Sequence, residues 1–237
     1  MAQRTRLLVI GAVVVAAIVV AVVVAAILTS GGGDEAPQAG VELPGSAETR
    51  ALLQGIPQNG AVIGAADAPV TLVEYADLQC PYCAQWATNA FPDLVEQYVR
   101  PGKVRIEFRG LAFIGPDSEK ALRAAYAAGD QRKLWEVVEL LYQHQGTENT
   151  GWVTDDLLSA VATSAPLDEA PWRDAFDSSA VDTAMQASAS AAETAGIRST
   201  PSFLVGPTGG TLERVEVQSL DAAGLQPALD DALAAAR

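Results

Sequence analysis

The sequence predicts an α/β fold in which a central mixed β-sheet is flanked by helices, with an inserted helical subdomain and one transmembrane helix before the folded part. Three observations lead to this prediction. A long apolar segment opens the chain, a strand–helix–strand pattern covers about residues 69–109, and strand character returns at 202–217 after a long helical stretch. The residues that remain after the apolar segment and its linker suffice for one well-buried core.

The apolar segment, residues 7–28, contains no charged or strongly polar side chain. As a helix it would span roughly 33 Å, close to the thickness of the bilayer core. Arg4 and Arg6 precede it, so the positive-inside rule places residues 1–6 in the cytoplasm. We therefore expect a single-pass anchor in the cell membrane, with the folded domain on the extracytoplasmic side. The alternative is a signal peptide cleaved after Val24-Ala25-Ala26, although the apolar run exceeds the usual signal core.

The composition of the rest of the chain limits its organisation and its partners. Residues 29–58 are rich in Gly, Ser, Pro and Gln, which predicts a flexible linker, and residues 59–237 form the predicted domain. The formal net charge of −14 argues against nucleic-acid binding, because that function requires Lys and Arg to neutralise phosphates. The chain has two cysteines, and a scaffold stapled by disulfides would have more of them, spread along the sequence.

The sequence pattern in the first half of the domain predicts a parallel βαβ unit. Residues 69–76 are β-branched and apolar and predict a central strand, with a short strand at 62–63 before it. A helix is expected from the cysteine motif to about Tyr98, with a kink at Pro92. Residues 103–109 alternate in polarity and predict the second strand. A connection of this length should be right-handed.

The second half predicts helices followed by a hairpin. Residues from about 117 to 196 are dominated by Ala, Leu, Glu, Asp and Gln, and we expect three to five structural helices there. One apolar stripe at helical spacing consists of Leu134, Val137, Val138 and Leu141. Residues 202–205 and 211–217 predict the two strands of a hairpin, and a last helix should begin near Gln226.

The motif Cys80-Pro81-Tyr82-Cys83 follows directly on a predicted strand and opens a helix. At a helix N-terminus, unpaired N–H groups and the helix dipole stabilise negative charge, so the pKa of Cys80 should be lowered and Cys80 should be the attacking sulfur. Pro81 suits the first helical position, because its missing N–H has no partner to lose there. Cys83, one turn further, should be more buried and act as the resolving thiol. The spacing lets the two sulfurs form a disulfide.

Two other uses of this cysteine pair fit less well. A structural zinc site needs four ligands, and the domain has no second cysteine pair. The chain's one histidine, His144, is isolated at a predicted helix end, where it should cap carbonyls or face water. A structural disulfide across so short a loop would stabilise little. The motif therefore indicates redox chemistry, and we expect neither a metal nor a cofactor.

Two segments carry a resemblance to a known family. Residues 73–83 read Val-Glu-Tyr-Ala-Asp-Leu-Gln-Cys-Pro-Tyr-Cys, and residues 199–206 read Ser-Thr-Pro-Ser-Phe-Leu-Val-Gly. In this order, with a helical segment between them, they resemble the DsbA-like branch of the thioredoxin-fold superfamily. The resemblance covers roughly residues 59–237. It implies a thioredoxin fold and the activity of a membrane-anchored thiol–disulfide oxidoreductase.

The resemblance also implies how substrates bind. Pro201 matches the cis-proline of the family, in a loop that faces the active-site disulfide, and Thr200 would offer its backbone to an extended substrate. Pro81 and Tyr82 match residues of the substrate-binding surface. Alternatively, Pro201 is an ordinary proline at the start of a strand.

Two further side chains near the motif each have two possible roles. Glu74 matches an acidic residue under the active site of the family, where burial would raise its pKa and let it exchange a proton with Cys83. It could instead face water at a strand edge. Trp86, one turn beyond Cys83, could pack in the core or form a lip of the substrate groove.

The direction of exchange depends on the reduction potential. Strong oxidases of the family usually have His where this chain has Tyr82 and Val where it has Thr200. We favour an oxidase that forms disulfides in exported, cysteine-containing proteins and is reoxidised by a quinone-linked membrane partner, as the family implies. The rivals are a reductase or isomerase of the same fold, a non-catalytic peptide-binding module, and a Cu(I)-delivery protein that binds the metal through its thiol pair.

Overall fold

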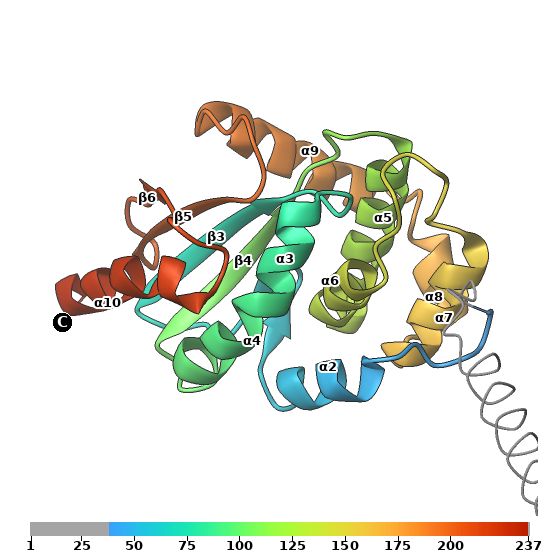
Figure 1. Ribbon diagram of the computed structural model, residues 1–237, viewed down its shortest axis with the longest axis horizontal. Coiled ribbons are helices and arrows are strands. Elements are labelled where there is room, and N and C mark those ends of the chain that lie inside the picture. The colour runs from blue at the N-terminus through green and yellow to red at the C-terminus, as the bar shows by residue number, and fades with distance from the viewer. Residues whose placement is uncertain (1–37, 237) are drawn as a thin grey trace, which may run out of the picture. The chain divides into compact units, whose positions relative to one another are not determined.

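The computed structural model describes residues 38–236 of the chain (Figure 1). The predicted transmembrane segment, residues 7–28, lies outside this range. Within residues 38–236, no helix combines the length and the apolar character that a membrane span requires.

The sheet has six strands in the order β1-β2-β4-β3-β5-β6. They are β1 (Gln58–Asn59), β2 (Val62–Ile63), β3 (Val70–Ala76), β4 (Val104–Gly110), β5 (Ser202–Pro207) and β6 (Glu213–Val215). Strands β3 and β4 are parallel, and the other neighbouring pairs are antiparallel. The predicted mixed sheet is therefore confirmed, with the cysteine motif directly after its central strand.

The two faces of β3 pack into separate clusters. All seven residues of β3 are buried, and successive side chains point to opposite faces of a sheet. Val70 and Leu72 belong to the main core, whereas Val73 and Tyr75 belong to a smaller cluster with residues at the end of α9. By the same alternation, Glu74 points into the main core.

The helix after the cysteine motif is divided. Helix α3 (Pro81–Asn89) ends before Ala90, and helix α4 (Phe91–Leu94) continues into the π-helical segment η1 (Val95–Val99). The kink expected at Pro92 therefore takes the form of a break two residues earlier. Proline has no backbone N–H to bond to the preceding turn, which accounts for a break at this place.

Between β4 and β5 the chain forms the helical insertion. Its elements are α5 (Pro116–Ala127), the 3₁₀ turn η2 (Ala128–Gln131), α6 (Leu134–Gln143), α7 (Asp155–Ser164), α8 (Glu169–Asp174) and α9 (Ser179–Thr194). Figure 1 shows α5 to α8 gathered beside one end of the sheet. The 3₁₀ turn η3 (Ala222–Gly224) and helix α10 (Gln226–Ala235) complete the fold, and α10 packs on β5 and β3.

The prediction of a flexible linker over residues 29–58 is wrong for the second half of that range. Residues 46–53 form helix α2 (Ser46–Leu53), which packs on α6. Leu43, Leu53 and Ile56 are buried in the main core. The Gly- and Pro-rich composition concealed these few apolar residues, which are too widely spaced to give a helical pattern but which the core covers.

Candidate active site

The two cysteines lie at the start of α3. Cys80 is the N-cap residue and has an extended backbone, and Pro81 occupies the first turn. The backbone N–H groups of Cys83 and Ala84 both donate to the Cys80 carbonyl oxygen at 3.1 Å, which closes the first helical turn. The thiols of Cys80 and Cys83 are both free. Cys80 is 5% exposed and Cys83 is completely buried, so an attacking molecule meets Cys80 first.

The two thiols have opposite pKa shifts. The pKa of Cys80 is lowered to about 6, chiefly by the hydrogen bond from the Cys83 thiol, with further hydrogen bonds from the Thr200 side chain and from backbone N–H groups of the first turn. The pKa of Cys83 is raised well above its usual value, first by burial and then by its interactions with Cys80 and Glu74. Cys80 is thus the thiolate at neutral pH, and Cys83 holds its proton.

The loop before β5 brings Thr200 and Pro201 against Cys80. The Thr200–Pro201 peptide bond is cis, and Cys80 Sγ lies 3.4 Å from the Thr200 carbonyl oxygen. Donation to this carbonyl favours the protonated thiol, but the hydrogen bond from Cys83 outweighs it, and the pKa of Cys80 is lowered. Thr200 and Pro201 are half-buried, and Pro81 is exposed. Tyr82 is 62% exposed and stands on the surface beside Cys80.

Glu74 lies in β3 and is completely buried. Its side chain is 0% exposed, and neither carboxyl oxygen has a hydrogen-bond partner. Burial raises its pKa well above the ordinary value. The expectation that it faces water is therefore excluded, and its charge acts on Cys83.

A second buried carboxyl group, which sequence reasoning missed, lies on α6. Glu139 is 3% exposed, and its Oε1 atom is fully buried without a partner. Burial and the charge of Glu74 raise its pKa well above the ordinary value. A signal was present in the sequence, since residues 134–142 are apolar around nearly the whole helix, which is typical of a buried helix.

A polar network behind Cys80 was also missed. Gln79 donates to Ser118 Oγ at 3.0 Å and accepts from the Asn149 backbone N–H at 2.7 Å. Gln145 Nε2 donates to the carbonyl oxygens of Leu78 (2.8 Å) and Cys80 (3.2 Å). These bonds attach the turn before Cys80 to the helical insertion.

The structure shows the surroundings of Trp86 and His144, for which the sequence left two possible roles each. Trp86 is 1% exposed and packs between Phe91 and Phe203, with ring centroids 5.8 and 5.2 Å away, so it is a core residue and not a lip of a groove. His144 follows α6, and its Nδ1 lies 2.9 Å from the Leu140 carbonyl oxygen, as expected of a capping side chain.

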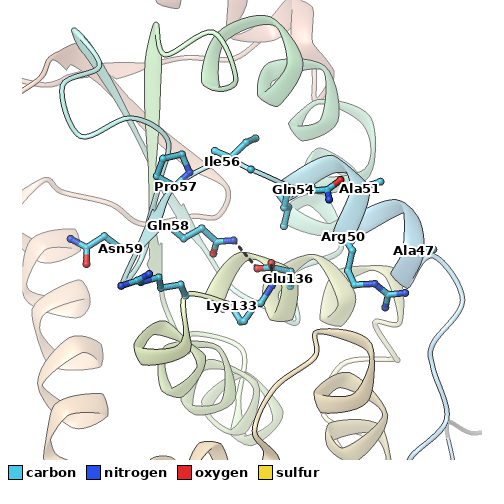
Figure 2. Close-up of a pocket in the computed structure, with 13 residues that line it drawn as sticks. Ala47, Arg50, Ala51, Gln54, Ile56, Pro57, Gln58, Asn59, Lys133 and Glu136 are labelled. Atoms are coloured by element: carbon cyan, nitrogen blue, oxygen red, sulfur yellow. Dashed lines mark hydrogen bonds and ion pairs between the residues drawn. The ribbon is translucent and has the colours of Figure 1, made fainter.

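A pocket of about 940 Å³ lies away from the cysteines, between α2, β1 and the start of α6. Figure 2 shows Gln58 and Glu136 pointing toward one another in it, joined by a hydrogen bond of 2.7 Å. Glu136 also pairs with Lys133 at 2.8 Å. This buried carboxylate is fully partnered, in contrast to Glu139 one turn later on the same helix.

Comparisons with known proteins agree with this geometry. A thioredoxin family model matches residues 57–226. The chain is 38% identical over 101 residues to the probable disulfide bond formation protein D of Bacillus cereus, a match that covers 42% of this chain and 47% of that relative. The aligned part thus spans about half, or less, of the curated relatives that it matches.

Several solved structures share the fold. Oxidised BdbD from Bacillus subtilis aligns with a TM-score of 0.63 and 21% identity, over 84% of this chain and 98% of that one. The alpha-DsbA1 protein of Wolbachia pipientis aligns with a TM-score of 0.65 and 20% identity, over 79% of this chain and 97% of that one. At these identities the likeness concerns the fold.

Proposed function

Because the chain belongs to the thioredoxin family, we propose that it is a DsbA-like thiol–disulfide oxidoreductase that forms disulfides in other proteins. The observation that supports this most is the asymmetry of the two thiols. Cys80 is slightly exposed with a pKa of about 6, and Cys83 is buried behind it with a raised pKa. An accessible thiolate and a buried partner that retains its proton are the two groups that disulfide exchange needs.

In the oxidising direction, a substrate thiolate attacks the Cys80 sulfur of the Cys80–Cys83 disulfide. A substrate–Cys80 bond forms, the Cys80–Cys83 bond breaks, and its electron pair passes to Cys83, which takes up a proton. A second substrate thiolate then attacks the substrate sulfur of this mixed disulfide and releases Cys80 as a thiolate. Two substrate thiols become a disulfide and the enzyme disulfide becomes two thiols. The low pKa of Cys80 makes it a good leaving group in the last step.

Glu74 is the proposed proton donor and acceptor for Cys83. Its raised pKa keeps it protonated at a pH where an exposed glutamate would be ionised. It lies in the same buried region as Cys83, whose pKa responds to its charge. A buried carboxylic acid at this place can neutralise the leaving thiolate without requiring water to enter the core.

The substrate would lie across the surface formed by Pro81, Tyr82, Thr200 and Pro201. Thr200 contacts Cys80 and precedes strand β5, which supports the proposal that its backbone pairs with an extended segment of the substrate. Tyr82, largely exposed, offers an apolar ring with a polar end to such a segment.

The proposed setting is the extracytoplasmic face of the cell membrane, with residues 7–28 as a single-pass anchor. The substrates would be exported proteins with cysteines, and a membrane redox partner would restore the disulfide. The names of the Bacillus relatives, which refer to disulfide bond formation, support the oxidising direction.

The decisive experiment is the reduction potential of the Cys80–Cys83 pair in the full chain. We would equilibrate it in glutathione buffers and follow Trp fluorescence, since Trp86 lies one turn from Cys83, with Cys80→Ser as the control for changes unrelated to the disulfide. A value near about −120 mV supports an oxidase, and one near about −270 mV a reductase. If no Cys80–Cys83 disulfide forms at any redox potential of the glutathione buffer, the oxidoreductase proposal is wrong.

A trapping experiment assigns the roles of the two sulfurs. In the Cys83→Ser variant, mixed disulfides with substrates should accumulate on Cys80, because the resolving thiol is absent. Cys80→Ser should trap none. Partners attached to Cys83 in the latter variant would reverse the assignment.

A further inference from the structure

An arginine without a partner lies in the loop between α9 and β5. Arg198 is exposed and stands two residues before Thr200, whose carbonyl oxygen lies 3.4 Å from Cys80 Sγ. Most basic side chains of residues 38–236 form ion pairs with Asp or Glu. Within that range, only Arg132 and Arg198 have neither an ion pair nor a side-chain hydrogen bond. Because the chain has a formal net charge of −14, a free cation this close to the reactive cysteine is an exception to its electrostatics.

The backbone on both sides of Arg198 is held by contacts within the fold. Ile197, directly before it, is 2% exposed, and its N–H donates to the Ala192 carbonyl oxygen at 2.9 Å. After it, the Ser202 hydroxyl donates to the Ser199 carbonyl oxygen at 2.7 Å. The base of the Arg198 side chain therefore has a fixed place on the surface, while its guanidinium is free to bind. A backbone that is ordered beforehand reduces the entropy lost on binding.

The spacing along the chain brings Arg198 close to a bound substrate. Consecutive Cα atoms are about 3.8 Å apart, so the Cα atoms of Arg198 and Thr200 are separated by at most about 7.6 Å. A substrate segment that pairs with the Thr200 backbone is extended and advances about 3.3 Å per residue. Side chains about two residues from the substrate cysteine are then within reach of the long Arg198 side chain. The planar guanidinium matches a carboxylate, to which it can donate two parallel hydrogen bonds.

We propose that Arg198 is a specificity-determining residue, which selects substrate segments that carry Asp or Glu close to the reactive cysteine. The inference rests on the proposed oxidoreductase function and names the substrate class of that site. The acidic domain as a whole repels such segments. A cation at the place where the segment docks offsets this repulsion locally, so it changes the choice of substrate and the rate of encounter more than it changes the chemistry of the disulfide.

The test measures how fast cysteine peptides reduce the oxidised full chain. Two peptide thiols become a peptide disulfide, and the Cys80–Cys83 disulfide becomes two thiols. Three peptides share one cysteine and differ only at the residues two before and two after it, which are both Glu, both Gln or both Lys. Stopped-flow Trp fluorescence gives the second-order rate constants. These are expressed per peptide thiolate, because neighbouring charges change the pKa of the peptide thiol.

Three variants isolate the role of the guanidinium. Arg198→Gln removes the cation, and Arg198→Lys keeps the charge without the planar pair of donors. Arg132→Gln is the matched control, because Arg132 is also exposed and without a partner, but it lines the pocket between α2, β1 and α6, away from the cysteines. Both Gln variants change the net charge of the chain by the same amount, so a difference between them reports the position of the charge.

The Glu peptide should depend most on Arg198. At about 50 mM salt, Arg198→Gln should react with it roughly two- to fivefold more slowly than the wild type, as expected for an exposed ion pair. The Gln peptide should react nearly as before, the Lys peptide should react faster, and Arg198→Lys should keep part of the preference for Glu. Arg132→Gln should leave the ratio of the Glu and Gln rate constants unchanged. At about 0.5 M salt the effect of Arg198 should shrink, because salt screens exposed charges.

Two results would overturn this inference alone. One is an equal change of the Glu-to-Gln ratio in Arg198→Gln and Arg132→Gln, which would assign the effect to net charge. The other is an equal loss of rate with the uncharged thiol 2-mercaptoethanol, because Arg198 would then act on the disulfide and not on the substrate. If the wild type reacts with none of these thiols, the oxidoreductase proposal is wrong, and this inference is wrong with it.

Discussion

The Ser118 hydroxyl donates a hydrogen bond of 2.6 Å to Asp77 Oδ1, and this contact joins the turn before Cys80 to helix α5. The same oxygen accepts from the Gln79 backbone N–H at 2.8 Å. Oδ2 accepts from the backbone N–H groups of Phe113 at 2.7 Å and Ile114 at 3.0 Å. One buried carboxylate therefore fixes the end of β3, the loop after β4 and the start of the helical insertion relative to one another.

Replacement of Asp77 by Ala should destabilise the protein strongly. Four donors, three backbone N–H groups and the Ser118 hydroxyl, would lose their acceptor, and we expect the free energy of unfolding to fall by about 3 kcal/mol or more. Ser118→Ala, which removes one of the four bonds, should cost about 1 kcal/mol. Urea unfolding measures both. Equal, small effects would mean that Asp77 does not hold these segments together.

The reactivity of Cys80 should follow its lowered pKa. In the reduced chain, alkylation of Cys80 should be half-maximal near pH 6, and Cys83 should react far more slowly. Cys83→Ala removes the hydrogen bond that lowers the pKa of Cys80 most, so the midpoint should rise, whereas Cys83→Ser keeps a donor and should raise it less. Iodoacetamide kinetics against pH measure this. An unchanged midpoint in Cys83→Ala would assign the low pKa to the helix N-terminus and Thr200.

Helix α2 should contribute to the stability of the domain. Leu53 is 3% exposed in the main core, so Leu53→Ala should lower the free energy of unfolding by about 2–4 kcal/mol. Leu52 is only partly buried, and Leu52→Ala should cost less. Chemical denaturation compares the two variants. A neutral Leu53→Ala would restore the flexible linker predicted from composition.

Stability should decrease as the pH rises above the ordinary pKa of a glutamate. The folded state raises the pKa of Glu74 and Glu139 above 4.5, so above that value it binds more protons than the unfolded state. Stability is therefore complete below this pKa and is lost as the pH rises through the folded values. Denaturation of the oxidised chain, in which no thiol titrates, should show the decline, and Glu74→Gln/Glu139→Gln should flatten it. An equally steep decline in the double variant would assign it to other groups.

The elements nearest the cysteines were predictable because local patterns specify them. Residues 69–76 are apolar and β-branched, which predicted the strand, and the motif that follows predicted a helix start at the cysteines. The structure has strand β3 at Val70–Ala76 and helix α3 beginning directly after Cys80. The proline and threonine before β5 were found only by resemblance, since nothing in residues 199–206 alone indicates that they meet Cys80.

The residues that sequence reasoning missed depend on tertiary contacts. Asp77 and Gln79 look like ordinary polar residues of a turn, and their partners Ser118 and Asn149 are 41 and 70 positions away. The apolar surroundings of Glu139 in residues 134–142 indicate a buried helix, but only the packing of the other elements on α6 determines that its Oε1 atom has no partner. The sequence analysis also missed helix α2, because this segment has few apolar residues. Only the packing of the rest of the core determines that they are buried.

The contact between Cys80 and Thr200 also has a consequence for the order in which the chain is made. Thr200 follows Cys80 by 120 positions, so both cysteines leave the ribosome well before the residue that contacts Cys80. Until β5 has been synthesised and paired with β3, Cys80 stands without its carbonyl neighbour at the edge of an incomplete sheet. During that interval the chain carries an exposed pair of thiols, which can form disulfides with the thiols of other chains before the fold is complete.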